Sequence, residues 1–210
     1  MASARFIAVA GNIGAGKSSL VKWLHHTFGL TPVYEPQDEN PYIEDFYRDM
    51  RRWAFPSQLF FLARRFRMQR DLERSLPTLP GRGIVQDRSL YEDAEIFAAH
   101  HHEAGNLDDR DWSTYSDLYA AMRAEVRPPD LMIYLRCPVK ALQARIRRRG
   151  RGYEQALPPA YLRDLERLYE GWFDRYTLSP TFVLDTSEID YVEDLFHRKA
   201  LIDELERLIG

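Results

Sequence analysis

Five short apolar runs are spread along the chain, and longer segments with helical periodicity separate them. The runs occupy residues 6–10, 32–34, 83–86, 131–135 and 181–184. Their apolar side chains do not simply alternate with polar ones, a pattern that is typical of strands buried on both faces. Such strands separated by helices predict an α/β fold, with a five-stranded parallel sheet covered by helices on both faces. Ligands of these sheets bind at the carboxyl ends of the strands, so the residues after each run are candidates for chemistry.

Composition and charge restrict the function further. The 210 residues are 45% hydrophobic and 29% charged, the balance of a globular chain, and we expect a single domain over residues 1–210. A single cysteine, Cys137, excludes an internal disulfide and suits a reducing cytoplasm. No apolar run is long enough to cross a bilayer, and the N-terminus lacks the apolar stretch of a signal peptide, so we expect a cytoplasmic protein without a membrane partner. The net charge of −3 argues against a nucleic-acid partner.

The segment after the first run matches G-x-x-x-x-G-K-[ST], a loop that binds nucleotide phosphates. It consists of Gly11, Asn12, Ile13, Gly14, Ala15, Gly16, Lys17 and Ser18, and Ser19 follows it. Backbone N–H groups of such a loop turn inward around phosphate oxygens, and the next helix directs its positive N-terminus at the same anion. We expect Lys17 to reach the transferred phosphate of ATP and Ser18 to be a ligand of Mg²⁺. A glycine-rich turn with an incidental lysine is the alternative.

Polar side chains also follow the second and third runs. Glu35 precedes Pro36, which keeps it extended, and it is the candidate general base that accepts a hydroxyl proton. Asp87 follows the third run and is expected to hold Mg²⁺, directly or through water. Arg88 is expected to contact the attacking oxygen and the phosphoryl group, because its guanidinium suits phosphate geometry. A solvated loop glutamate and a plain Asp–Arg turn are the alternatives.

A phosphate-binding loop does not define the second substrate. The N-K-x-D and D-x-x-G motifs of a GTPase are absent from the sequence, and so is the signature of an ABC-type ATPase. A chain of this size with polar residues at several strand ends fits a small-molecule kinase better. A nucleoside monophosphate kinase of the thymidylate type and a regulatory nucleotide-binding module are the alternatives.

These motifs, in this order, resemble the deoxynucleoside kinase family over nearly the whole chain. The resemblance rests on residues 11–19, 34–36, 87–89 and 145–151, and segments 40–42, 52–53 and 86–93 are most similar to bacterial deoxyadenosine kinases. It implies a P-loop kinase fold and transfer of the ATP γ-phosphoryl group to the 5′-hydroxyl of a deoxynucleoside. Deoxyadenosine is the expected substrate, with deoxycytidine also possible, and a deoxyguanosine kinase is an alternative. The resemblance also implies a homodimer, for which helices at 91–102 and 111–125 are candidates.

The same resemblance indicates which residues surround the nucleoside. Gln58, Arg65, Asp93 and Phe97 match base-binding positions, and Tyr47 and Glu154 match positions that hold the sugar 3′-hydroxyl. Gln58 and Arg65 share one face of a helix predicted over 56–75, and Phe97 would stack on the base. An amide can turn to suit any base, whereas an ionised Asp93 accepts from an exocyclic amine and so favours adenine. Arg65 can donate to a purine ring nitrogen or steady Asp93. A helix face packed in the core, with one Arg–Asp ion pair, is the alternative.

An arginine-rich segment ends a helix that begins near Val139 and predicts a lid over about residues 145–156. The resemblance places Arg145, Arg149 and Arg151 in this lid, where they would neutralise phosphate charge, and leaves Arg147 and Arg148 in solvent. A basic surface patch or an RNA contact is the alternative. Asp190 and Tyr191 follow the last strand and are assigned to the adenine of ATP by the same resemblance.

The three consecutive histidines, His100 to His102, do not form a predicted metal site. Consecutive side chains on a helix point in different directions and cannot hold one ion together. We expect them to be surface or partly packed residues.

Overall fold

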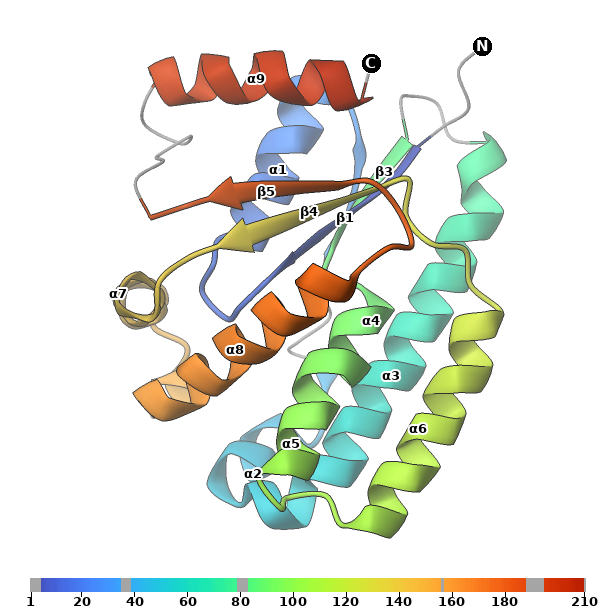
Figure 1. Ribbon diagram of the computed structural model, residues 1–210, viewed down its shortest axis with the longest axis vertical. Helices are drawn as coiled ribbons and strands as arrows, with labels where there is room; N and C mark the ends of the chain where they lie inside the picture. Colours follow the sequence, from blue (N-terminus) through green and yellow to red (C-terminus); the bar gives the residue numbers. More distant parts are fainter. Residues whose placement is uncertain (1–4, 35–38, 79–82, 156, 188–194, 210) are drawn as a thin grey trace.

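The computed structural model describes residues 5–34, 39–78, 83–155, 157–187 and 195–209 (Figure 1). Its sheet has five parallel strands in the order β2-β3-β1-β4-β5. The strands are β1 (Arg5–Gly11), β2 (Thr31–Val33), β3 (Gly83–Asp87), β4 (Leu131–Arg136) and β5 (Thr181–Asp185). Each strand agrees with its predicted run to within one residue at either end, and the predicted α/β fold is confirmed. Val9 lies opposite both Asp87 and Ile133, so the carboxyl ends of the three central strands meet at one edge.

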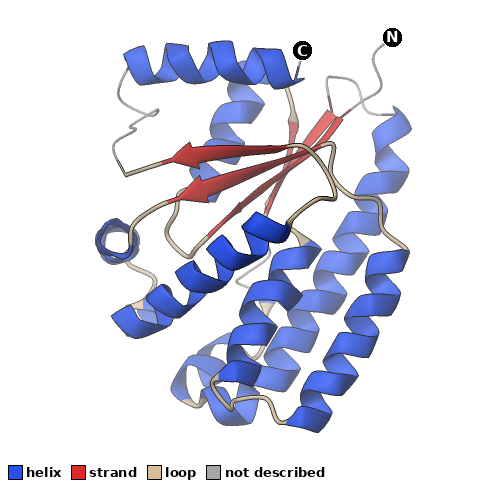
Figure 2. Cartoon of the chain, viewed as in Figure 1, coloured by secondary structure: helices blue, strands red, loops and turns tan. Residues whose placement is uncertain are grey.

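Helices cover both faces of this sheet, as Figure 2 shows. They are α1 (Lys17–Phe28), α2 (Ile43–Arg48), α3 (Met50–Ser75), α4 (Leu90–Glu92), α5 (Ala99–Glu103), α6 (Asp109–Ala124), α7 (Val139–Arg149), α8 (Pro159–Arg175) and α9 (Leu195–Ile209). One π-helix, η3 (Asp93–Ala98), joins α4 to α5, and two short 3₁₀ turns are η2 (Leu76–Thr78) and η4 (Gly152–Glu154). Helices α1 and α9 lie on one face of the sheet, and α8 and α4 lie on the other (Figure 1). Within the described ranges, no helix combines the length and the apolarity that a membrane crossing requires.

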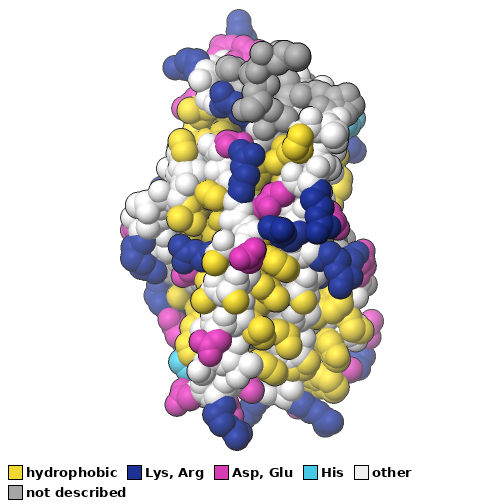
Figure 3. Space-filling view, turned by 90° about the vertical axis from the view of Figure 1, so that its right-hand side faces the viewer, with side chains coloured by type: hydrophobic (Ala, Val, Ile, Leu, Met, Phe, Trp, Pro, Cys, Tyr) yellow, Lys and Arg dark blue, Asp and Glu magenta, His cyan; other side chains and the backbone are white. Residues whose placement is uncertain are grey.

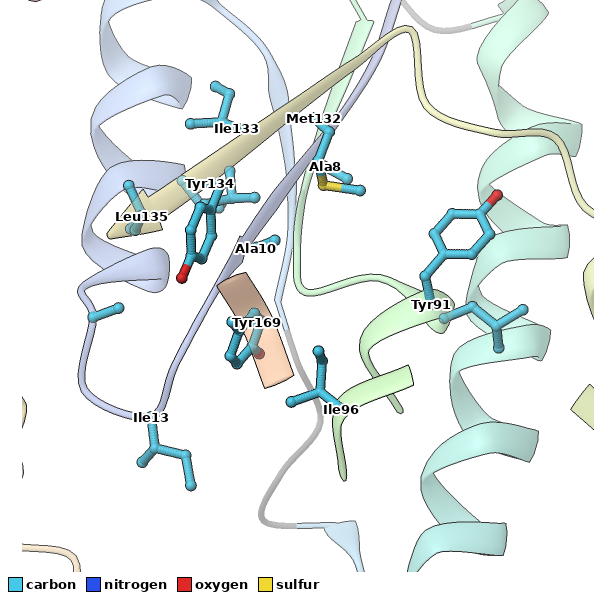
Figure 4. Close-up of a cluster of buried hydrophobic side chains, with 14 of the residues drawn as sticks. Ala8, Ala10, Ile13, Tyr91, Ile96, Met132, Ile133, Tyr134, Leu135 and Tyr169 are labelled. Atoms are coloured by element: carbon cyan, nitrogen blue, oxygen red, sulfur yellow. The ribbon is translucent and has the colours of Figure 1, made fainter. Parts of the chain in front are cut away.

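The core lies between the sheet and the helices on its two faces. The central strand β1 pairs with a strand on each side, and helices cover both of its faces. Four of its residues are therefore fully buried: Ile7, Ala8, Val9 and Ala10. Figure 4 shows side chains of β1 and β4 together with Tyr169, which projects from α8. Each valine or isoleucine side chain buried in this way stabilises the fold by about 1.5–3 kcal/mol.

The long helix α3 begins earlier than predicted. The helical spacing predicted it over residues 56–75. Instead it begins at Met50, and Pro56 lies inside it. Asp49 caps the N-terminus by accepting a hydrogen bond from the N–H of Arg52 at 3.2 Å, which lets the helix start a full turn and more ahead of the proline. The apolar Ala54 of this added segment is fully buried, so packing supports the extension.

Two of the three consecutive histidines are buried, contrary to expectation. His100 is 6% exposed and His101 is fully buried, whereas His102 lies nearer the surface. The His101 ring packs edge-on against Phe46 and stacks on Tyr161, at centroid distances of 5.1 and 6.1 Å. Burial lowers the pKa of His101 to about 3, so the ring is neutral and behaves as an aromatic core residue. Sequence spacing alone could not reveal this, because α5 is covered by α8.

Candidate active site

The phosphate loop joins β1 to α1 at the carboxyl edge of the sheet. Gly11, Gly14 and Gly16 all have positive φ, at 149°, 83° and 103°. A β-carbon on Gly11 would lie 2.9 Å from the carbonyl oxygen of Leu135, so both the backbone angle and the neighbouring strand require glycine there. The loop therefore has the tight turns that direct backbone N–H groups at a bound anion.

Lys17 and Asn12 hold this loop in shape. The ammonium of Lys17 donates to the carbonyl oxygens of Gly11 at 2.8 Å and Asn12 at 3.1 Å. The Asn12 side chain accepts from the N–H of Ile13 at 2.8 Å and donates to the carbonyl of Leu162 at 2.9 Å. Lys17 is 7% exposed, so its charge lies inside the loop where phosphate oxygens would bind.

Ser18 and Asp87 meet across the edge of the sheet. The Ser18 hydroxyl donates to Oδ2 of Asp87 at 2.5 Å. Oδ1 of Asp87 is buried and has no hydrogen-bond partner among the described residues. A buried oxygen of this kind needs a ligand, and Mg²⁺ binds to one or two protein oxygens while phosphate and water supply the rest. The two predicted metal ligands therefore form a pair that fits Mg²⁺.

Arg88 has an unusual backbone conformation. Its φ of +66° is the one positive value for a non-glycine residue in the described part of the chain. Its N–H donates to the carbonyl of Val9 at 2.9 Å, and its guanidinium carbon lies 4.4 Å from the centre of the Phe97 ring. Strain of this kind persists where surrounding contacts over-determine the residue, and it is concentrated at functional sites.

A pocket next to Arg88 contains most of the side chains predicted to bind the nucleoside. Its lining residues are Ile13, Ile43, Phe46, Tyr47, Gln58, Phe61, Arg88, Asp93, Phe97 and Tyr161. The Gln58 side chain is 3% exposed and makes no hydrogen bond with another described residue, so its amide is available to a ligand. Asp93 and Phe97 come from the π-helix η3, a rare element that is frequent at functional sites.

Arg65 does not line this pocket and instead lies behind Asp93. Its Nε donates to Oδ2 of Asp93 at 2.6 Å, and the two side chains are only 1% and 4% exposed. Its Nη1 is directed at the carbonyl oxygens of Asp87 and Arg88, at 3.5 and 3.4 Å. Arg65 therefore fixes both the Asp93 carboxylate and the backbone of the Asp87–Arg88 turn.

Two of the three predicted lid arginines converge on Glu154. Arg149 forms a short ion pair with this carboxylate, and Nη1 of Arg151 lies 3.5 Å from its other oxygen. Glu154 is fully buried, and the turn η4 that carries it packs against α2, the helix of Tyr47. The structure thus brings the two predicted sugar contacts to adjoining elements and places lid arginines beside one of them.

The third predicted lid arginine, Arg145, makes a different set of contacts. Its guanidinium donates to the carbonyls of Ala15 and Thr186, at 3.1 and 2.8 Å, and to the Cys137 sulfur at 3.2 Å. It therefore joins α7 to the phosphate loop and to the residues after β5. Arg147 and Arg148 are exposed, as predicted. Glu35, Asp190 and Tyr191 lie outside the described residues.

Two buried residues of the site were missed by the sequence reasoning. Glu92 is fully buried and Tyr169 reaches it from α8, with 2.8 Å between the phenol oxygen and Oε1. Glu92 also forms a capping box with Ser89, at the start of α4. The S-x-x-E spacing of that box was a usable signal for Glu92, whereas nothing local to α8 indicated Tyr169.

The phosphate loop and the Ser18–Asp87 pair at the edge of a parallel sheet define a P-loop phosphotransferase. Residues 7–210 match the deoxynucleoside kinase family, and the chain belongs to that family.

Named relatives and solved structures agree with this assignment. The chain is 36% identical over 205 residues to the deoxyadenosine/deoxycytidine kinase of Bacillus subtilis, a match that covers 97% of this chain and 92% of that protein. It is 33% identical over 208 residues to a deoxyguanosine kinase of Lactobacillus acidophilus, covering 95% and 88%. The structure of deoxyadenosine kinase from M. mycoides with bound dATP superposes with a TM-score of 0.83 at 30% identity, covering 96% of this chain and 99% of that one.

Proposed function

We propose that this protein transfers the γ-phosphoryl group of ATP to the 5′-hydroxyl of a deoxynucleoside, with deoxyadenosine as the preferred acceptor and deoxycytidine as a second. The observation that carries this proposal is the pocket beside Arg88. There the unbonded amide of Gln58 and the fixed carboxylate of Asp93 line the same small space. A site built from such polar groups discriminates strongly between bases.

Arg65 holds the Asp93 carboxylate in place, and that carboxylate favours a base that presents an exocyclic amine to it. An ionised Asp93 attracts an amine hydrogen and repels a carbonyl oxygen, and adenine and cytosine carry amines where guanine and thymine carry carbonyls. Guanine would be accepted if Arg65 moved between it and Asp93. The contacts of Arg65 with Asp93 and with the carbonyls of Asp87 and Arg88 oppose that movement. The similarity to deoxyguanosine kinases keeps a deoxyguanosine kinase as the alternative function.

Phosphoryl transfer needs positive charge around the transferred group and an acceptor for the hydroxyl proton. In this proposal Lys17 and Arg88 hold the phosphoryl charge, and Arg149 and Arg151 of the lid add to it. Glu35 accepts the proton of the 5′-hydroxyl. Tyr47 and Glu154 hold the 3′-hydroxyl of the sugar, Arg145 belongs to the lid, and Asp190 and Tyr191 contact the adenine of ATP.

Ser18 and Asp87 would hold Mg²⁺, as their donor atoms and the unpartnered Oδ1 of Asp87 suggest. When bound, Mg²⁺ would neutralise phosphate charge.

A homodimer and a cytoplasmic location belong to the same proposal. Figure 3 views the face that contains α3 and α6, and hydrophobic side chains gather over its lower half. Leu118 of α6 is 37% exposed, and Phe55, Phe66 and Met122 are only partly buried. Leu118 and Met122 belong to the helix at 111–125, so this apolar surface supports pairing with a second copy through that candidate, and the helix at 91–102 stays a prediction. A buried free cysteine, Cys137, supports a location in the reducing cytoplasm.

A substrate panel with labelled ATP tests the proposal. We expect kcat/KM to be highest for deoxyadenosine, then for deoxycytidine or deoxyguanosine, and lowest for thymidine. Including dAMP and thymidylate as acceptors tests the monophosphate-kinase alternative in the same assay. Preference for thymidine would contradict the assigned base pocket, preference for a monophosphate would contradict the acceptor class, and ATP binding without transfer to any acceptor would indicate a regulatory module.

A further inference from the structure

A buried carboxylate joins the parts of the site that contact phosphate. Glu92 is 0% exposed, and both of its oxygens accept hydrogen bonds. Oε2 accepts from the N–H and hydroxyl of Ser89, at 2.8 and 3.2 Å. Oε1 accepts from the N–H of Gly11, the first residue of the phosphate loop, at 3.3 Å and lies 3.8 Å from Nη1 of Arg88. One side chain therefore contacts the phosphate loop and the Asp87–Arg88–Ser89 turn.

Tyr169 completes the connection between Glu92 and Arg88. Its hydroxyl donates to Oε1 of Glu92 at 2.8 Å and accepts from Nη1 of Arg88 at 2.9 Å. Burial raises the pKa of the Tyr169 hydroxyl well above its usual range, so the group keeps the proton that it donates. Its ring meets Phe97 edge-on, and Phe97 in turn packs against the Arg88 guanidinium. Arg88 is thus held on one face by Phe97 and at Nη1 by Tyr169.

We propose that Glu92 and Tyr169 are positioning residues that set the Arg88 guanidinium against the phosphate loop for phosphoryl transfer. This inference rests on the proposed function. Neither residue lines the nucleoside pocket, so they act through Arg88 and Gly11. Positioned cationic donors stabilise phosphoryl transfer only when their geometry is fixed before the reaction, because they then need no reorganisation in the transition state. A guanidinium that lost its acceptor would sample other positions, and turnover would fall while nucleoside binding remained.

Tyr169→Phe is the most direct test, because it removes only the hydroxyl and keeps the packed ring. We expect kcat to fall about 10- to 100-fold, the effect of losing one hydrogen bond to a charged group, while KM for deoxyadenosine stays within about threefold. Tyr134→Phe is the matched control. Tyr134 is also buried, stacks on Tyr169 at 5.8 Å, and donates to a glutamate, Glu170, at 3.0 Å (Figure 4). Because that glutamate does not contact Arg88 or the phosphate loop, kcat of this variant should equal that of the wild type.

A double-mutant cycle separates positioning from general loosening of the core. Arg88→Lys keeps the charge but removes the Nη1 group that Tyr169 contacts. Adding Tyr169→Phe in this background should lower kcat less than twofold further. Glu92→Gln, which keeps the size but not the charge, gives a second test if Tyr169→Phe folds poorly, and it should also lower kcat with KM nearly unchanged.

Three results would overturn the inference. The first is wild-type kcat for both Tyr169→Phe and Glu92→Gln. The second is that Tyr169→Phe lowers kcat by the same factor in the wild-type and Arg88→Lys backgrounds, because Tyr169 would then act independently of Arg88. The third is that Tyr134→Phe lowers kcat as much as Tyr169→Phe does. A wild-type chain that transfers no phosphoryl group to any deoxynucleoside would contradict the proposed function itself, and the inference with it.

Discussion

The buried ion pair between Arg65 and Asp93 gives a prediction with two separate readouts. The two side chains are 1% and 4% exposed and lie 2.6 Å apart, with Asp93 lining the nucleoside pocket and Arg65 behind it. Asp93→Ala would leave the Arg65 guanidinium buried beside an apolar methyl group. It would also remove the fixed acceptor for an amine on the base.

The magnitude follows from burial. Removing one partner of a buried pair costs about 3–5 kcal/mol, because the remaining charge stays desolvated. For a domain of this size each kcal/mol lowers the melting temperature by about 2–4 °C, so a fall of about 6–20 °C is expected. The ratio of kcat/KM for deoxyadenosine to that for deoxyguanosine should shrink about tenfold or more, because neither base is then attracted or repelled by a carboxylate.

Urea unfolding and a kinetic panel with four deoxynucleosides measure these effects. Asp45→Ala is the control, since Asp45 pairs with Arg48 at the surface, where the side chains are 46% and 71% exposed. That change should alter stability by less than about 1 kcal/mol. Replacing both buried partners, Arg65→Met with Asp93→Leu, should recover most of the lost stability. An Asp93→Ala protein with wild-type stability and an unchanged ranking of bases would refute this account of the pocket.

Three further predictions concern the general base, the lid and the stability of the fold in acid. Glu35→Gln should lower kcat about 10²-fold or more with nucleoside affinity kept, and near-native turnover would remove Glu35 from the mechanism. Arg149→Ala should lower kcat with little loss of melting temperature, because the Arg149 side chain is 36% exposed and Arg151 remains beside Glu154. Arg148→Ala, at an exposed neighbouring position, should leave both unchanged, and a large loss of melting temperature with kcat retained would make Arg149 structural. Burial lowers the pKa of His101 to about 3 in the folded chain. Because the unfolded chain takes up this proton near pH 6.5 and the folded chain does not, His101 destabilises the fold as pH falls from about 6.5 toward 3, by at most about 1.4 kcal/mol per pH unit. His101→Phe should therefore flatten the urea midpoint against pH over that range, and parallel curves for the two proteins would contradict the buried neutral ring.

Sequence alone determined the parts of this protein that depend on local pattern. The strands were predicted closely because a strand buried on both faces must be apolar throughout, and the central strands are so buried. The phosphate loop was predicted because its glycines are required by backbone angles that other residues rarely adopt. Asp87 and Arg88 could be singled out because a recognisable strand ends at Asp87 and Arg88 follows it.

Tertiary structure decided everything that depends on which distant segments meet. Arg65 was expected either to donate to the base or to steady Asp93, and the fold places it behind Asp93, because a helix face seen in sequence does not show how far each side chain lies from the pocket. The predicted start of α3 at residue 56 was wrong because the cap at Asp49 and the burial of Ala54 extend the helix before Pro56. The burial of His101 and the contact of Tyr169 with Glu92 depend on the position of α8, which packs against α5 and η3. A buried polar network is specified by the chain segments that exclude water around it, and those segments are brought together only by the fold.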